Sequence, residues 1–489
     1  MLNKNRLFLF LLFSLLLSPL FGQTYATGAI FDPEKHAQTP LKARLITRNY
    51  TNIPRTASLR QYSPIPENQG EYGTCTAWST VFAARTISES IVLNRTNQEQ
   101  NSLHAFSPLD TYIGIRALNG GLSAGYETFS FLHLLNRLKE RGIMGISIPS
   151  ALDYLVQRGA VRRNETERIK NLQLTFIANY ENIRRYTISE YVALYRSYES
   201  PWTIEERVTP VKKSISEGKP VIIAMNTPLS FHRARDVWKE RDDPNIIQGY
   251  HAMCVVGYND NMHGGAFEIQ NSWGTEWGND GYIWITYNDF AKFVVEAYEI
   301  IENLALYRDA TRFAASININ VFNDTRDMPV TFDAQGFYRT RFAYPNGTVF
   351  QFQMTNGYPA YVYAFSADSN TTEIVRVFPG AGVSPVLDYV DSTVAWPDEN
   401  TGMMLDGTAD THYLVVLYSK QALDINAIEQ RFARERGVFP ERVARAVGQN
   451  FIPYSNVQYS NDKIEFSTVS TDPRSVFGLL LAINQGAAR

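Results

Sequence analysis

The chain of 489 residues is predicted to be an α+β protein with two successive parts. Apolar residues recur at helical spacing between residues 74 and 220, and short β-like runs separated by Gly- and Asn-rich turns follow up to residue 305. A second, smaller β-rich part with two helices begins near Arg308. One domain usually takes about 150 residues, so this length also indicates two or three domains.

The helices expected in the first part are placed by their apolar spacing and by proline and glycine. A helix is expected to begin at Thr74, because seven apolar residues from Ala77 to Val92 fall at intervals of about three or four. Proline at a first helical position and glycine after a last one are common, so Thr209-Pro210 and Gly218 predict a start and a stop. Further helices are expected at Pro108–Leu118, Phe129–Arg141, Ile148–Arg158 and Ser189–Ser197. Before all of these, Thr24–Ile53 is expected to be irregular because its prolines prevent long helices.

The expected strands fall into two groups. In the first part they are Val221–Met225, His251–Tyr258, Phe267–Gln270 and Tyr282–Thr286. In the second part they are Ser316–Phe322, Thr348–Thr355, Tyr361–Ser366, Ile374–Phe378, Thr411–Tyr418 and Val476–Ile483, with turns at Asn346-Gly347 and Asn356-Gly357 and helices at Asn426–Arg436 and Pro440–Val447. We therefore divide the chain into residues 1–22, an N-terminal extension at 23–50, a first domain at 51–305 and a β-rich accessory domain at 306–489.

The first 22 residues are typical of a secretory signal peptide. Lys4 and Arg6 supply positive charge, and Leu7–Leu17 is an apolar run interrupted only by Ser14. The alternative is a membrane anchor, but a spanning helix needs about 20 apolar residues and no second such run follows. We expect a protein exported to the periplasm or the medium, with no membrane span once the leader is removed.

The composition excludes several classes of protein. With 46 Lys and Arg against 49 Asp and Glu, the chain has no basic surplus with which to bind nucleic acid. Its two cysteines, Cys75 and Cys254, are too few for a disulfide scaffold or a four-cysteine zinc site. The spacing of the histidines suggests no metal site, so no cofactor or metal is expected.

The first candidate site is the string Asn68–Ser79, in which Cys75 stands where the helical pattern begins. A thiol at a helix N-terminus is more acidic than a free one, and the thiolate is the reactive form. Six residues earlier, Gln69 offers an amide that could donate a hydrogen bond to an oxyanion, together with the Cys75 N–H. On its own, a lone cysteine is more often a small core residue than a nucleophile.

A second segment offers the base and its orienting partner. His251 opens an apolar β run, and Asn271 follows in the string Gln270–Gly278, which also contains Trp273 and Trp277. Asn271 can accept a hydrogen bond from one imidazole nitrogen and so fix which nitrogen faces Cys75. Cys254 lies within the same β run and is expected to be an apolar core residue without a chemical role. The alternative for these two cysteines is a Cys75–Cys254 disulfide, which would abolish the proposed site.

These residues, in this order, resemble the papain family of cysteine peptidases over about 250 residues. The strings Asn-Ser-Trp-Gly at Asn271–Gly274 and Trp-Gly-x-x-Gly-Tyr at Trp277–Tyr282 carry the resemblance. It implies a two-subdomain fold, with Cys75 in a helical half and the other residues in a β-barrel-like half. It also implies hydrolysis of a polypeptide through a Cys75 thioester, with His251 as base and acid, Asn271 as orienting residue and Gln69 in the oxyanion hole.

The chain also departs from the family's pattern. Thr76 stands where many members have Trp directly after the nucleophile, which resembles a bacterial branch of the family. About 45 residues separate the leader from Gln69, too few for the long helical propeptide of lysosomal and plant members. A short plug along the cleft, formed by Thr24–Thr51, is one arrangement that would block the site instead.

Other functions remain open at this point. The same residues could catalyse transpeptidation, deamidation or hydrolysis of a non-protein amide, and the fold could serve as a binding module without catalysis. The set Gln69, Cys75, His251 and Asn271 counts against the binding module, which has no chemical need for all four. The accessory domain resembles, more weakly, a β-rich domain found beside bacterial peptidases. It shows no catalytic set, and its partner is unknown.

Overall fold

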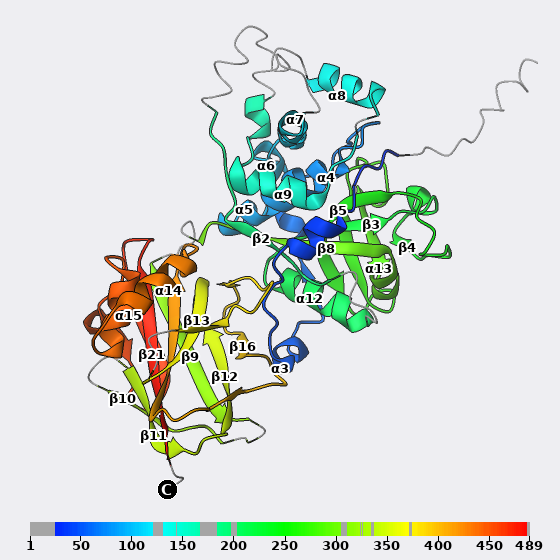
Figure 1. Cartoon of the computed structure of the whole chain (residues 1–489). Helices are drawn as coiled ribbons and strands as arrows, with labels where there is room; N and C mark the ends of the chain where they lie inside the picture. Colours follow the sequence, from blue (N-terminus) through cyan, green and yellow to red (C-terminus); the bar gives the residue numbers. More distant parts are fainter. Residues whose placement is uncertain are drawn as a thin grey trace, which may run out of the picture.

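The computed structural model describes residues 25–120, 131–142, 144–166, 183–196, 203–304, 311–322, 324, 326–333, 337–370 and 374–486. Two bodies lie side by side, a first region at residues 53–304 and a second region at residues 311–486 (Figure 1). The expected leader at 1–22 lies outside the described residues. The expected boundary at residue 306 falls within residues 305–310, which are also outside the described residues, and it stays a prediction.

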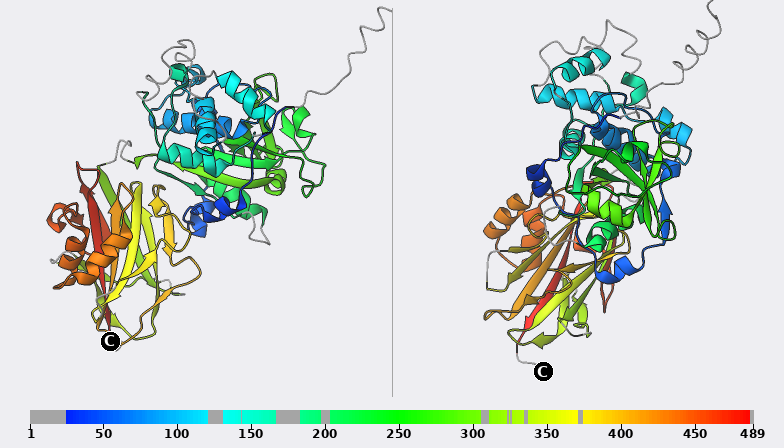
Figure 2. Two further views of the ribbon diagram at one scale, coloured as in Figure 1. Left: turned by 45° about the horizontal axis from the view of Figure 1, so that its top comes forward. Right: turned by 90° about the vertical axis from the view of Figure 1, so that its right-hand side faces the viewer.

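The helices between residues 75 and 157 gather on one side of the first region, and the helices Ile204–Ser216 and Tyr287–Phe293 lie apart from them (Figure 1 and Figure 2). The helix expected from Thr74 begins at Cys75 and runs without a break through α4, a π-helical stretch η2 and α5. The helices are α4 Cys75–Ala77, η2 Trp78–Arg85, α5 Thr86–Val92, α6 Gln98–Leu103, α7 Pro108–Leu118, α8 Phe131–Glu140, α9 Ile148–Gln157, α12 Ile204–Ser216 and α13 Tyr287–Phe293, with short 3-10 turns at Arg60–Tyr62 and Phe231–Arg233. Among the residues that the structure describes, no helix has the length and apolar character needed to cross a bilayer.

The β half of the first region is one sheet of eight strands. Its order is β2-β8-β3-β5-β6-β7-β4, and β1 pairs with β5. The strands are β1 Thr56–Ser58, β2 Glu190–Ala193, β3 Val221–Asn226, β4 Val237–Trp238, β5 Tyr250–Asn259, β6 Ala266–Gln270, β7 Tyr282–Thr286 and β8 Val294–Ile301. Strand β5 lies inside the sheet and carries His251, whose backbone pairs with Met225 of the neighbouring strand β3.

One predicted helix of the first region was wrong, and another begins earlier than predicted. Ser189–Ser197 contains the edge strand β2, whose residues pair with β8, because tertiary pairing outweighs a weak helical spacing around Tyr191 and Val192. The helix expected to start at Thr209-Pro210 begins at Ile204 instead, where Thr203 and Glu206 form a reciprocal capping box. Pro210 therefore lies inside α12, while Gly218 follows its end with φ +78°, as expected.

The second region is a sandwich of two sheets, with α14 Ile425–Arg434 and α15 Phe439–Val447 on the outer face of one of them (Figure 1). The first sheet has the order β10-β11-β21-β18-β13-β14 with β15 against β13, and the second has the order β16-β12-β9-β20-β19 with β17 against β12. The strands are β9 Arg312–Val321, β10 Val330–Asp333, β11 Phe337–Tyr344, β12 Val349–Asn356, β13 Ala360–Asp368, β14 Val375–Phe378, β15 Val386–Leu387, β16 Thr393–Trp396, β17 Met403–Met404, β18 Thr411–Ser419, β19 Gln458–Tyr459, β20 Ile464–Val469 and β21 Val476–Gln485. All predicted strands of this part are present, but the two Asn-Gly sites connect strands of different sheets rather than forming hairpins.

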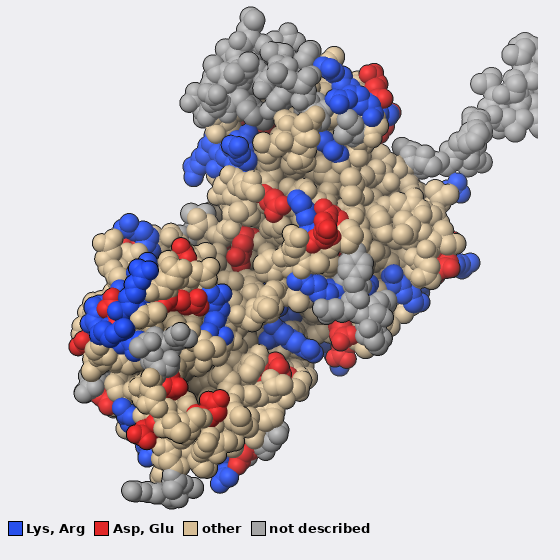
Figure 3. All heavy atoms as spheres, in the orientation of Figure 1, with Lys and Arg blue, Asp and Glu red and all other residues tan. Residues whose placement is uncertain are grey.

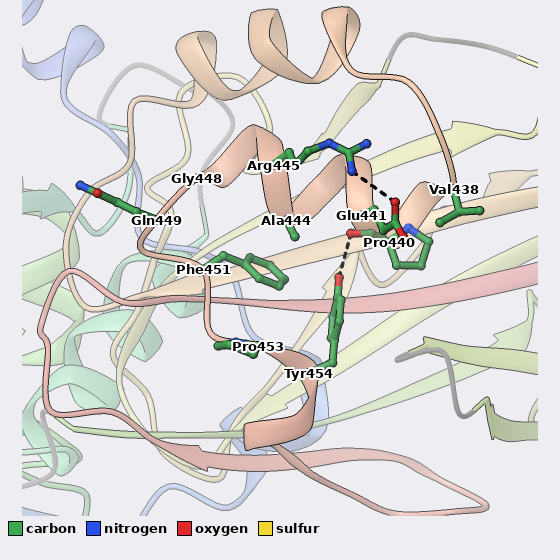
Figure 4. A pocket seen from close by; sticks show the side chains of 10 residues that line it. All are labelled: Val438, Pro440, Glu441, Ala444, Arg445, Gly448, Gln449, Phe451, Pro453 and Tyr454. Carbon is green, nitrogen blue, oxygen red and sulfur yellow. Dashed lines mark hydrogen bonds and ion pairs between the residues drawn. The ribbon is translucent and has the colours of Figure 1, made fainter.

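An apolar pocket of about 930 Å³ lies on the outer surface of the second region. Its walls are α15 and the loop that follows it, with Ala444, Phe451 and Tyr454 facing inward (Figure 4). On the face drawn in Figure 3, acidic and basic side chains are interspersed in small groups.

Residues 25–52, called here the N-terminal segment, connect both regions. They contain two short helices, α2 Pro33–Gln38 and α3 Thr47–Thr51, so the expectation of an irregular stretch was only partly correct. Asp32 caps α2 by accepting a hydrogen bond from the Lys35 N–H, and Pro33 occupies its first turn. Figure 1 draws the segment in blue, with α2 beside β8 and α3 beside β16.

Candidate active site

Cys75 lies at the start of the α4–η2–α5 helix and is completely buried. The backbones of Ala252, the residue after His251, and of Gly28 in the N-terminal segment lie close enough to its thiol to lower its pKa, against the larger effect of burial. The helix from one half and strand β5 from the other therefore place Cys75 beside the backbone that carries His251.

His251 and Asn271 form the hydrogen bond that the sequence predicted. The Nε2 atom of His251 lies 2.7 Å from Oδ1 of Asn271, and the Asn271 oxygen also accepts from the Ser272 N–H at 2.7 Å. The backbone N–H of Asn271 donates to the Gly281 carbonyl at 3.0 Å, which fixes the loop after β6. The Nδ1 atom of His251 has no hydrogen-bond partner among the described residues. It is thus the nitrogen left free to exchange a proton.

Two tryptophans shield this hydrogen bond. The ring of Trp273 stacks on His251 with a centroid distance of 4.4 Å, and Trp277 packs edge-on against Trp273 at 5.2 Å. Both indoles are 1% exposed. Because they exclude water, they strengthen the bond between His251 and Asn271.

Gln69 is held by the loop that carries Asn271. The Ser272 hydroxyl donates to Oε1 of Gln69 at 2.6 Å, and the Gln69 N–H donates to the Ser272 carbonyl at 2.8 Å. These contacts occupy Oε1 of Gln69 and leave its Nε2 atom to donate hydrogen bonds to other groups. In this structure Nε2 donates to the carbonyls of Tyr72 at 2.8 Å and Ala26 at 3.1 Å.

The N-terminal segment covers the site. Tyr25 stacks on Trp273 at 4.7 Å, and its backbone N–H donates to Nδ1 of His232 at 3.0 Å. The Ala26 carbonyl accepts from the indole Nε1 of Trp273 at 3.2 Å as well as from Gln69. The amide that could hold an oxyanion is therefore already engaged by the chain's own backbone.

Two residues further on, the segment pairs with both halves of the first region. Ala29 donates through its N–H to the Tyr250 carbonyl at 3.1 Å, and the Gly28 carbonyl accepts from the Ile146 N–H at 3.2 Å. Gly28 lies so close to Gly73 that a Cβ built on it would lie 2.4 Å from the Gly73 Cα. Only glycine fits here, because real Cβ atoms do not approach backbone atoms this closely.

Burial under this cover changes the protonation of the catalytic candidates. It lowers the pKa of His251 to about 3, an effect that the hydrogen bond to Asn271 only partly offsets. It also raises the pKa of the Cys75 thiol, although backbone hydrogen bonds act in the opposite direction. At neutral pH the covered pair is therefore a thiol and a neutral imidazole, not an ion pair.

The remaining sulfur and histidine candidates lie apart from this chemistry. Cys254 is a free, fully buried thiol whose pKa is raised by burial, and Cys75 is also free, so the disulfide alternative was wrong. His412, in the second region, bonds to Gln485. Among the described residues, no group of three His, Cys, Asp or Glu side chains is arranged to hold a metal ion.

Comparison with known proteins identifies the family. Residues 53–302 match the family described as papain family cysteine protease, and this match spans half of the chain. The chain therefore belongs to the papain family of cysteine proteases and has its α+β fold, followed by an additional β-rich region.

Individual relatives are more distant. Peptidase 1 of Dermatophagoides farinae is 25% identical over 237 residues, which are 48% of this chain and 61% of that protein. Cathepsin K of Mus musculus is 24% identical over 55% of this chain and 66% of its own length. The chain thus spans less than two thirds of these relatives. Among solved structures, xylellain, a cysteine protease from Xylella fastidiosa, is 18% identical over 57% of this chain and 96% of its own, with a TM-score of 0.40.

Two parts of the site were missed in the sequence, and a third was expected over too wide a range. Ser272 orients Gln69, although it was visible only as a letter in the Asn-Ser-Trp-Gly string. His232 stacks on Trp273 at 4.9 Å and accepts from Tyr25, a role that no local spacing indicates. The plug along the cleft was expected over Thr24–Thr51, but the residues that cover the site are Tyr25–Ile30, while α3 lies against the second region.

Proposed function

We propose that the protein is an exported cysteine peptidase that hydrolyses peptide bonds and is latent while its N-terminal segment covers the site. One observation supports this most strongly. His251 bonds to Asn271, Ser272 links Gln69 to the loop of Asn271, and helix α4, which begins at Cys75, packs against the strand that carries His251. Export rests on the leader-like residues 1–22, and the substrate class rests on membership of the papain family.

In the proposed reaction, Cys75 attacks the scissile carbonyl as a thiolate, its proton having passed to Nδ1 of His251. The negative charge that develops on the carbonyl oxygen is stabilised by Nε2 of Gln69 and the Cys75 N–H. His251 then gives its proton to the leaving amine, and a thioester remains. Water, deprotonated by His251, attacks the thioester and releases the acid and the free thiol. Asn271 holds the imidazole through Nε2 during both steps.

Latency follows from the same contacts. The Ala26 carbonyl takes the Nε2 donor of Gln69, and Gly28 lies against the thiol, so a substrate carbonyl has no access. Removal of Tyr25–Ile30 returns water to the site. It thereby removes the main cause of the lowered pKa of His251 and the raised pKa of Cys75. We expect a thiolate–imidazolium pair to form at that point.

The replacement of Cys75 by alanine tests the proposed function. Cys75→Ala removes one sulfur from a packed site, so the fold should survive while casein hydrolysis by the uncovered enzyme falls to the background rate. Circular dichroism and thermal unfolding serve as the check on folding. Cys254→Ala, which removes the other buried thiol, is the matched control and should retain activity. Equal hydrolysis by Cys75→Ala and the native protein would reject the assignment, and thiol reactivity without cleavage of any protein would favour a narrower amide substrate.

A further inference from the structure

The N-terminal segment is bound in two halves by two different parts of the molecule. Tyr25–Thr39 lies on the first region, whereas residues 41–50 lie mainly on the second, with the Lys42 N–H donating to the Ala193 carbonyl of β2 at 3.0 Å. The N–H of Leu41 donates to the Gly382 carbonyl at 2.7 Å, and the Leu41 carbonyl accepts from the Ser384 N–H at 2.9 Å. Further along, the Ile46 N–H donates to the Thr393 carbonyl at 3.0 Å. This half therefore extends the backbone hydrogen bonding of the second region.

The same half contributes side chains to the core of the second region. Ala43 and Leu45 are each 2% exposed and pack in the cluster between the two sheets. At the surface, Glu399 accepts from both the N–H and the hydroxyl of Thr47, at 2.9 and 2.6 Å. Burial of apolar groups and charge-assisted hydrogen bonds act together here.

Lys42 joins the two regions through a buried ion cluster. Its Nζ lies 2.5 Å from Glu299 of β8 and 3.3 Å from Asp388 of the second region, and all three side chains are 5% exposed or less. Lys219 of the first region also pairs with Asp388, at 2.7 Å. Because a buried charge without a partner is costly, withdrawal of Lys42 is opposed strongly.

We propose that the second region is a receptor for residues 41–50, and that it retains the N-terminal segment over Cys75 after the chain is cut between α3 and β1. This inference rests on the proposed latent peptidase, and it gives the second region a role in keeping the enzyme latent. The loop between α3 and β1 is open to a protease, since Asn52, Pro54 and Arg55 are exposed. A cut there breaks none of the contacts described above.

Residues 41–50 act as the anchor of the N-terminal segment, and a cut on the other side of this anchor has a different effect. Ala37 and Gln38, at the end of α2, are exposed and lie between the two halves. Cutting there separates Tyr25–Ala37 from its anchor, so this piece loses the high effective concentration that the anchor provides. Activation thus requires a cut between Ala37 and Gln38, and a cut between α3 and β1 alone leaves the site covered.

The test uses the full chain with a recognition sequence for a specific protease inserted either between Asn52 and Ile53 (the outer cut) or between Ala37 and Gln38 (the inner cut). After cutting, size exclusion with mass spectrometry measures how much fragment stays bound, and iodoacetamide measures the rate of Cys75 alkylation. We expect the outer cut to leave the fragment bound and the rate within about two-fold of the uncut chain. The inner cut should raise the rate at least about ten-fold.

The anchor itself is tested on the outer-cut protein. Glu399→Ala removes two hydrogen bonds at an exposed position and should speed fragment loss by about five-fold. Glu435→Ala, which removes an ion pair with Arg445 elsewhere on the second region, is the matched control and should change nothing. Equal fragment loss from the two variants, or loss after the outer cut as fast as after the inner one, would overturn the inference. Because neither readout needs turnover, a retained fragment on a protein without peptidase activity would reject only the proposed function.

Discussion

Gly28 is the position at which the cover over the active site is most sensitive to a single substitution. A Cβ at this residue would lie 2.4 Å from both the Cα and the carbonyl oxygen of Gly73. Carbon atoms in contact prefer about 3.5–4.0 Å, so Gly28→Ala creates an overlap of more than about 1 Å with backbone that cannot rotate away. We therefore expect the segment to be displaced from Cys75.

The magnitude follows from the cost of overpacking. Inserting a methyl group into a filled site typically costs about 1–3 kcal/mol, which corresponds to a shift of about 5- to 150-fold in the ratio of open to covered protein. The alkylation rate of Cys75 should rise by the same factor, because only the open form exposes the thiol. Circular dichroism should remain native, since the sheet and the helices keep their contacts.

The control for this substitution is Gly380→Ala. A Cβ at Gly380 meets no heavy atom within 4 Å, and its φ is not in the left-handed region. The alkylation rate of this variant should equal that of the native protein. If Gly28→Ala is folded and its Cys75 reacts no faster than that of Gly380→Ala, the segment does not control access and the reasoning fails.

Two further predictions concern the Gly28→Ala protein, in which the site is open. Asn271→Ala leaves Nε2 of His251 without its acceptor, so kcat for a peptide substrate should fall about 10- to 100-fold but stay above that of Cys75→Ala. A loss as complete as that of Cys75→Ala would show that Asn271 does more than orient the imidazole. Ser272→Ala releases Oε1 of Gln69, so kcat should fall about ten-fold at unchanged KM, which is less than the roughly 10²-fold loss expected from Gln69→Ala. A change confined to KM would place Ser272 in substrate binding instead.

The sequence indicated the catalytic candidates because their chemistry is local. The spacing within Asn271–Gly274 and Trp277–Tyr282 places an amide, two indoles and tight turns in one short segment, so the string by itself predicts a shielded polar site. The hydrogen bond from His251 to Asn271 could be anticipated in the same way. Strands β5 to β7 could also be predicted from the sequence, because their apolar runs are bounded by glycine and asparagine.

What the sequence concealed depends on contacts between distant residues. Gly28 and Gly73 are 45 positions apart and carry no side chain, so nothing in their pattern indicates that they touch. Strand β2 forms because β8 offers it an edge, and its own four residues are too few to show a period. The pairing of β11 with β21 likewise joins segments more than 100 residues apart.

The most direct test of the central claim is the pH dependence of thiol labelling in the open protein. A peptide-like epoxide is reacted with Gly28→Ala, with and without His251→Ala, from pH 5 to pH 9, and the adduct is mapped by mass spectrometry. An imidazolium beside Cys75 lowers the pKa of the thiol, so labelling should persist into mildly acidic solution when His251 is present. Without His251 the rate should fall about ten-fold for each pH unit below the pKa of the thiol.

The covered native chain should behave differently from both. Burial raises the pKa of Cys75, so its labelling should be slow at pH 7 and should increase only in alkaline solution. Labelling at Cys75 that persists at acidic pH only in the open protein with His251 is the result that this account predicts. Identical pH profiles with and without His251, or an adduct at Cys254, would contradict it.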